Sequence, residues 1–166
     1  PADELVNTWD EDRLRHILRV YGEEKNASRI ASLIVRNRPH ETTHDLVRIT
    51  DRVNKNHTGH SAKRVFQAIR IAVNDELTAL EDALTDGLDL LEAGGRMSII
   101  TFHSLEDRIV KHFFKAHSET HVPKGLPLID LPVPDMTLIT RKPVLPSQEE
   151  QDRNPRSRSA KLRAAR

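Results

Sequence analysis

Residues that could do chemistry gather directly after one short apolar stretch of the chain. Residues 94–108 read GGRMSIITFHSLEDR, which predicts a glycine turn, a buried strand over Met97–Phe102, a polar bend and the start of a helix. In open α/β sheets, ligands bind beyond the carboxyl ends of the strands. The polar side chains that follow this strand would lie at such a site: His103, Ser104, Glu106, Asp107 and Arg108. The alternative is structural, because Ser104 can cap the next helix and acidic residues favour its positive end.

A second polar group falls on a long predicted helix. Arg70 and Asn74 are four residues apart, and Gln67 shares their side of the helix. This stripe either faces a binding cleft or simply meets water and a local hydrogen-bond network. The pattern by itself leaves both interpretations open.

The C-terminal segment is strongly basic. Arg153–Arg166 contains six Arg or Lys residues and no acidic residue. Such a segment either binds successive phosphates, without reading base sequence, or is a solvated, disordered end. The phosphate-binding candidates in it are Asn154, Arg156, Arg158, Ser159 and Lys161. Aromatic residues are few, and Phe66, Phe113 and Phe114 are expected in the core rather than stacked on bases.

Residues 40–44 read HETTH and match the zinc-protease pattern His-Glu-x-x-His. That pattern binds zinc only when both histidines share one helical face and a third ligand is near. Here Pro39 comes directly before the motif, and Thr42 and Thr43 suit a helix cap. We therefore expect His40 in a loop and His44 in the first helical turn, with no metal site.

The spacing of apolar residues predicts a small helical bundle in the first part of the chain. One helix is expected over Asp12–Tyr21, one around Ile30–Ile34, and one that begins at Thr42 or Thr43. Residues 54–60, NKNHTGH, are polar and rich in turn formers. They predict a boundary between a helical subdomain at residues 1–57 and a second domain at residues 58–166.

The second domain is predicted to mix helices and strands. Residues 61–92 are helical in pattern, with a bend near Asn74, and Met97–Phe102 is expected to be a central strand followed by a helix. Residues 117–134 are rich in Pro and Gly and predict a long surface loop. A strand at residues 137–140, a short capped helix at 147–152 and a last strand at 162–165 complete the pattern. The two late strands are expected to pair antiparallel.

Composition sets bounds on location and partners. The chain has 166 residues, is 37% hydrophobic and carries a formal net charge of +1. It contains no cysteine, so it offers neither disulfides nor thiolate metal ligands. No signal peptide or membrane-length apolar run is present in the sequence. We expect a cytoplasmic protein without membrane contact.

Three long motifs in the same order resemble the bacterial RsmH/MraW family. They are residues 64–77, RVFQAIRIAVNDEL; residues 101–108, TFHSLEDR; and residues 154–163, NPRSRSAKLR. The opening helices, with YGEE at residues 21–24, are similar too. The resemblance implies an S-adenosylmethionine-dependent methyltransferase that modifies the N4 amine of a decoding-centre cytidine in 16S rRNA of the small ribosomal subunit. Its implied fold is α/β, the C-terminal part of a class I, Rossmann-like sheet with a helical insertion subdomain.

The resemblance also implies that the methyl-donor site lies outside these residues. Family members carry it on a glycine-rich loop after the first strand, whereas the six glycines here are scattered and form no Gly-x-Gly-x-x-Gly. We expect a fragment of the enzyme that has no bound cofactor and is inactive alone.

In this comparison His103, Ser104 and Glu106 complete the target pocket rather than supply its main proton acceptor: they either hold the target cytidine or buttress the donor site. The residues expected at the RNA are Arg70, Asn74, Arg108, Lys111, Asn154, Arg156, Arg158, Ser159 and Lys161. Two alternatives remain open. The chain could act as a non-catalytic RNA-binding module, or it could be a structural piece that forms a homodimer through an exposed sheet edge.

Overall fold

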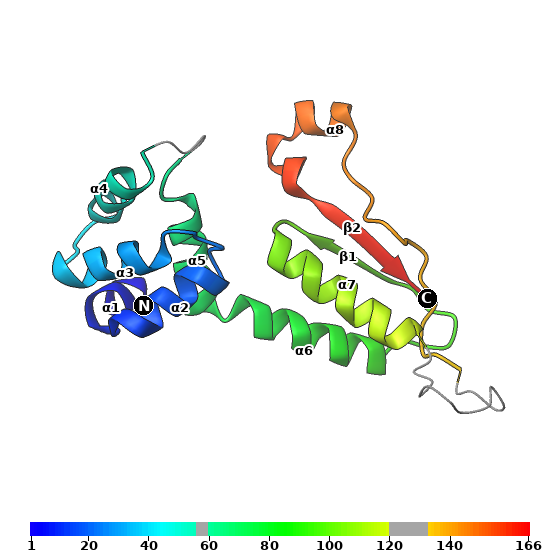
Figure 1. The fold of residues 1–166 in the computed structure, drawn as a ribbon. Coiled ribbons are helices and arrows are strands. Elements are labelled where there is room, and N and C mark those ends of the chain that lie inside the picture. Colours follow the sequence, from blue (N-terminus) through cyan, green and yellow to red (C-terminus); the bar gives the residue numbers. More distant parts are fainter. Residues whose placement is uncertain (56–59, 120–132) are drawn as a thin grey trace, which may run out of the picture. The chain divides into compact units, whose positions relative to one another are not determined.

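The computed structural model describes residues 1–55, 60–119 and 133–166, and contacts divide the chain into two compact units, Pro1–Glu76 and Leu77–Arg166 (Figure 1). The predicted domain boundary at 57/58 lies in the segment 56–59, outside the described residues. The structure is a helix-rich α/β chain with a small two-stranded sheet, which confirms the mixed class. In the described parts no helix is both long and apolar enough to cross a membrane.

The first unit is built from helices. Its elements are α1 (Ala2–Thr8), α2 (Glu11–Val20), α3 (Ala27–Arg36), α4 (Thr43–Val53) and α5 (Lys63–Asn74). The three predicted helices are present, and α1 and α5 pack with them. Asp10 begins α2 by accepting a 2.8 Å hydrogen bond from the Arg13 amide, and a Thr42–Asp45 capping box begins α4. The core of the unit includes Leu14, Leu18, Ile30, Ile34 and Val65, each at most 1% exposed.

The predicted bend in the long helical region is present. Helix α5 ends at Asn74, and Asp75 has a φ of 51°, a left-handed conformation that a continuous helix does not allow. Helix α6 (Glu76–Asp89) follows.

The second unit places helices beside a two-stranded sheet. Its further elements are β1 (Met97–Thr101), α7 (Ser104–Ser118), α8 (Gln148–Arg153), the short 3-10 helix η1 (Pro155–Ser159) and β2 (Lys161–Ala165). Met97 and Ile99 of β1 pack with Val110 and Phe114 of α7. Because side chains alternate across a strand, Ile100 lies on the opposite face and is 58% exposed. The unit therefore has one covered and one open sheet face.

Strands β1 and β2 are antiparallel, with Met97 opposite Ala165 and Thr101 opposite Lys161. In the described part of the chain β1 pairs with β2 alone, so the prediction of a central strand is not met there and the other edge of β1 is unpaired. The strand Leu162–Ala165 and the helix after Ser147 are confirmed. The predicted loop at 117–134 lies mostly outside the described residues.

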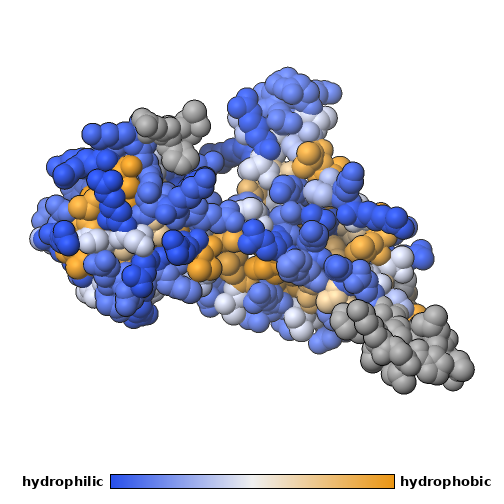
Figure 2. Space-filling model, in the orientation of Figure 1, coloured by the Kyte–Doolittle hydropathy of each residue, from blue (hydrophilic) through white to orange (hydrophobic). Residues whose placement is uncertain are grey.

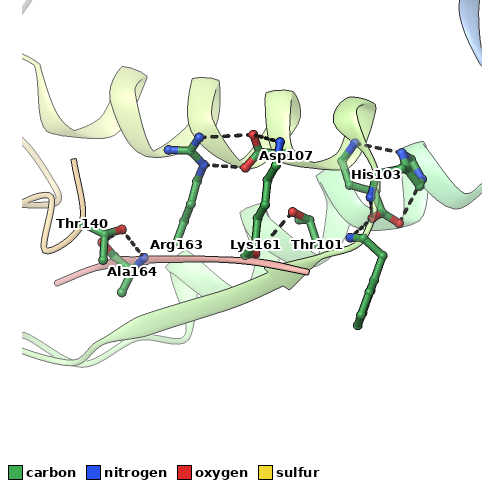
Figure 3. Close-up of polar contacts among 9 residues, drawn as sticks. Thr101, His103, Asp107, Thr140, Lys161, Arg163 and Ala164 are labelled. Carbon is green, nitrogen blue, oxygen red and sulfur yellow. Dashed lines mark hydrogen bonds and ion pairs between the residues drawn. The ribbon is translucent and has the colours of Figure 1, made fainter. Parts of the chain in front are cut away.

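The predicted strand at Thr137–Thr140 is wrong as a regular strand. The segment runs beside β2 but forms one isolated bridge, Leu138 to Ala165. The amides of Ile139 and Thr140 both donate to the Ala164 carbonyl, at 3.0 and 3.1 Å, so two residues oppose one, as in a β-bulge. The Thr140 hydroxyl then accepts from the Ala164 amide at 2.9 Å and replaces a backbone partner (Figure 3).

Candidate functional site

The end of β1 and the start of α7 are joined by one reciprocal cap. His103 is the N-cap residue, and its Nδ1 accepts a hydrogen bond from the Glu106 amide at 3.4 Å. The Glu106 carboxylate in turn accepts from the amides of Phe102, at 2.8 Å, and His103, at 3.3 Å. The sequence alternative of a structural cap is therefore correct, but its residue is wrong, because His103 caps the helix and Ser104 is the first helical residue.

This cap fixes the tautomer of His103. Since Nδ1 accepts a hydrogen bond, the neutral ring carries its proton on Nε2. That atom lies 3.1 Å from the second Glu106 oxygen, in a geometry that makes no hydrogen bond. The His103 side chain is 11% exposed, and the Ser104 residue beside it is exposed. The His103 Nε2 atom is therefore buried and has no hydrogen-bond partner among the described residues.

Farther along α7, Asp107 binds two basic residues of β2 (Figure 3). Arg163 donates to both carboxylate oxygens, at 2.7 and 3.2 Å, and the Lys161 ammonium lies 3.4 Å from one of them. The Arg163 hydrogen bonds, helped by the two positive charges, hold the pKa of Asp107 below its usual value. This network ties the first turns of α7 to β2 across 56 residues of sequence.

The basic C-terminal segment is structured, so the alternative of a disordered end is wrong. Ser157 is buried, and its hydroxyl donates to the Asn154 carbonyl at 2.8 Å, which holds the turn of η1. Asn154, Arg156, Arg158 and Ser159 are exposed. Strand β2 begins at Lys161, directly after η1, and Lys161 pairs with Thr101 at the end of β1. Two groups predicted separately, residues 103–106 and 154–161, therefore lie at the same end of the sheet.

The remaining candidates lie on helices α7 and α5. Arg108 and Lys111 are exposed on α7. Arg70 and Asn74 belong to the first unit, where both bind the Glu76 carboxylate, the Arg70 Nε at 2.8 Å and the Asn74 amide at 3.1 Å. Gln67 of the same stripe donates to the Tyr21 carbonyl at 2.9 Å. The stripe thus includes a local hydrogen-bond network.

The HETTH segment is divided as expected. Helix α4 begins at Thr43, so His44 lies in its first turn and His40 precedes it. His40 is buried, and its Nε2 lies 2.8 Å from the Ile34 carbonyl oxygen. The two imidazoles therefore do not share the helical face that the zinc pattern requires.

Two features of the site were missed at the level of sequence. Phe102 is 53% exposed, on the same sheet face as Ile100, and the alternation of the strand could have indicated this. The Asp107–Arg163 pair joins residues so far apart in sequence that no local pattern could have found it.

Comparison with known proteins agrees with the motifs at this site. The model of the MraW methylase family matches residues 1–166. The chain belongs to the MraW methylase family. It is 57% identical over 164 residues to "Ribosomal RNA small subunit methyltransferase H 1" of Acholeplasma laidlawii (strain PG-8A), covering 99% of this chain and 55% of that protein.

Two phytoplasma proteins are similar to a comparable degree. "Ribosomal RNA small subunit methyltransferase H" is 51% identical in Aster yellows witches'-broom phytoplasma (strain AYWB) and 50% identical in Onion yellows phytoplasma (strain OY-M). Each match covers 99% of this chain and 54% of the relative. The chain thus spans about half the length of these MraW family relatives.

Proposed function

We propose that this chain is the RNA-facing part of an enzyme that transfers a methyl group from S-adenosylmethionine to the N4 amine of a decoding-centre cytidine in 16S rRNA. The observation that carries the proposal is the β1–β2 register, which pairs Lys161, at the end of the basic segment 154–161, with Thr101, two residues before His103, in a chain of this family. The printed names of the relatives support the ribosomal RNA substrate. A cytoplasmic location follows from that substrate.

Methyl transfer to this amine depends on the orientation of the reactants more than on a strong acid or base. The lone pair of a cytosine amine is delocalised into the ring, so the amine must be aligned with the methyl donor and must release a proton. The target base must also leave its stack to be reached. We assign His103 and Ser104 to holding the flipped cytidine. Glu106 is a positioning residue, because its carboxylate binds the backbone of residues 102 and 103.

Cations around this end of the sheet would hold the RNA backbone. We assign this role to Arg108, Lys111, Arg156, Arg158 and Lys161, with Asn154 and Ser159 completing the phosphate contacts, and a cleft-facing role to Arg70 and Asn74. Lys161 lies near Asp107, so its share of the phosphate attraction is reduced. Contacts of this kind place RNA without reading its sequence.

The described residues do not fit the methyl donor itself. Gly94 and Gly95 come before β1, whereas a donor loop follows the carboxyl end of a strand. The residues that do follow β1 form the His103–Glu106 cap. We therefore propose that the donor binds to residues outside this sequence, and that the 166 residues alone neither bind it nor transfer methyl groups. The class I sheet is part of the same proposal.

The test compares a full-length family protein with this chain, using donor calorimetry and methylation of small-subunit RNA. The longer protein should bind S-adenosylmethionine, and the 166-residue chain should not. In the longer protein, His103→Ala and Ser104→Ala should lower turnover, while the exposed His112→Ala on the same helix should not. Unchanged turnover and unchanged RNA affinity in both site variants would contradict the role assigned to His103 and Ser104.

The exposed arginines of η1 also favour a second candidate, a non-catalytic RNA-binding module. A longer protein that binds RNA but never transfers methyl groups, with donor present, would favour this second function. A homodimer through the unpaired edge of β1 is a separate proposal. Sedimentation of the chain over a range of concentrations would test it.

A further inference from the structure

A groove of about 750 Å³ opens on the uncovered sheet face of the second unit. Its apolar lining comes from the end of β1, from β2 and from the segment that precedes α8. The residues are Ile100, Phe102, Leu162, Val144 and Leu145. Four of these side chains are more than half exposed, which is unusual for large apolar residues gathered in one place. In Figure 2 an apolar patch lies next to the hydrophilic region of α8 and η1. The volume falls within the range of about 300–1,000 Å³ typical of ligand sites.

Phe102 contributes to this groove an aromatic ring on a fixed backbone. Its backbone amide donates to Glu106 at 2.8 Å, so the main chain at the end of the strand is fixed. Its side chain is nevertheless 53% exposed and lines the groove. An exposed ring on an ordered backbone can stack with a flat ligand at low entropic cost.

The charge on the groove is positive. Arg156 lines it, and among the described residues the Arg156 side chain has no hydrogen bond or ion pair. Glu150 is the acidic residue of the lining, and Arg153 binds its carboxylate at 2.6 Å. The Arg153 hydrogen bond lowers the pKa of Glu150, so this carboxylate is charged but neutralised by its partner. Arg156 remains as the unmatched charge and favours an anionic ligand.

We infer that this groove binds one unpaired nucleotide of a single-stranded RNA, with its base stacked on Phe102 and its phosphate bound by Arg156. The inference rests on the proposed function and adds a base contact to a surface that was predicted to touch phosphates alone. Aromatic stacking combined with a cation is how proteins commonly hold single-stranded bases. The nucleotide is not the proposed methyl acceptor, because the groove lining includes neither His103 nor Ser104.

The experiment measures fluorescence anisotropy of a labelled single-stranded RNA of about eight nucleotides, a length within the usual site size. Phe102→Leu should weaken binding about 5- to 100-fold without changing its salt dependence, and Phe102→Tyr should retain affinity. Arg156→Gln should weaken binding and reduce the slope of log affinity against log salt by about 0.7. An abasic strand of equal charge should bind wild type and Phe102→Leu equally.

Two exposed residues of the same unit, away from the groove lining, serve as controls. Leu90→Ala, at 83% exposure, and Arg96→Gln should leave affinity unchanged, apart from a small loss of non-specific attraction for the second. Since Phe102→Leu keeps an apolar side chain, it also separates base stacking from simple apolar packing against protein.

The possible results separate this inference from the proposed function. If the wild-type chain fails to bind RNA, the proposed function of this surface fails. If it binds RNA and Phe102→Leu binds equally well, the groove is not a base site. If Phe102→Leu instead abolishes a concentration-dependent dimer seen by sedimentation, and RNA affinity is unaffected, a second copy of the chain is the occupant and the inference is overturned.

Discussion

At the residue scale, the ion pair of Asp107 and Arg163 buries two opposite charges. Both residues are less than 10% exposed, so each charge has lost most of its water. Such pairs add little net stability relative to well-packed apolar residues, but removal of one partner leaves the other charge buried and unmatched. The two-point contact at 2.7 and 3.2 Å also fixes the angle of α7 against β2. Through that helix it positions His103.

Asp107→Asn should therefore destabilise the second unit strongly. We expect a loss of about 3 kcal/mol, because the Arg163 guanidinium remains buried with a neutral partner. Urea unfolding followed by far-ultraviolet circular dichroism measures this loss. The exposed Asp82→Asn is the matched control and should change stability by less than about 0.5 kcal/mol. The double variant Asp107→Leu, Arg163→Met should recover much of the loss, and a double variant as unstable as Asp107→Asn would contradict the argument.

The same pair predicts how stability changes with pH. The pKa of Asp107 is lower in the folded protein than in the unfolded chain, so the folded state favours the charged carboxylate. Its stabilising effect is complete above the unfolded pKa of about 3.9 and is lost as pH falls through the lower folded pKa. The stability difference between wild type and Asp107→Asn should be constant above about pH 5 and should shrink below about pH 4. Urea unfolding at a series of pH values measures it, and a difference that grows in acid would contradict this mechanism.

At the element scale, sequence reasoning succeeded where the determining signal is local. The caps at Asp10, Thr42 and Ser147 and the bend at Asp75 follow from neighbouring residues, and all are present. It failed at Thr137–Thr140, where a bulge against Ala164 depends on a distant strand. For the site, the sequence indicated the residue types. It could not indicate that η1 lies near the end of β1, nor that Asp107 pairs with Arg163. Both depend on the pairing of β1 with β2, which no local pattern encodes.

Two glycines should respond oppositely to substitution by alanine. At Gly22, after the end of α2, a Cβ would lie 2.7 Å from the carbonyl oxygens of Arg64 and Leu18, which are backbone atoms. Gly22→Ala should cost about 1–3 kcal/mol. At Gly87, in α6, a Cβ would meet the flexible end of Met97 at 3.1 Å, so the gain in helix propensity of up to about 1 kcal/mol should dominate. Urea unfolding of both variants tests this, and equal effects would refute the packing argument.

At the scale of the whole molecule, each unit buries its own core. The first core takes its residues from α1–α5, and the second from α6, β1, α7, Met136 and β2. The single tryptophan, Trp9, packs against the first core. Its fluorescence therefore reports on unfolding of the first unit, whereas hydrogen exchange at Val110, fully buried in the second core, reports on the other.

These separate cores predict separate responses to mutation. Gly22→Ala should move the Trp9 transition to lower urea and leave exchange at the Val110 amide unchanged, because its clash lies wholly between residues of the first unit. Asp107→Asn should accelerate exchange at Val110 and leave the Trp9 transition in place, because Asp107 and Arg163 both belong to the second unit. Urea titration and hydrogen exchange on the same two variants provide the comparison. If either variant shifted both reporters equally, the two units would unfold as one cooperative body, and the effects assigned above to single units would have to be assigned to the whole chain.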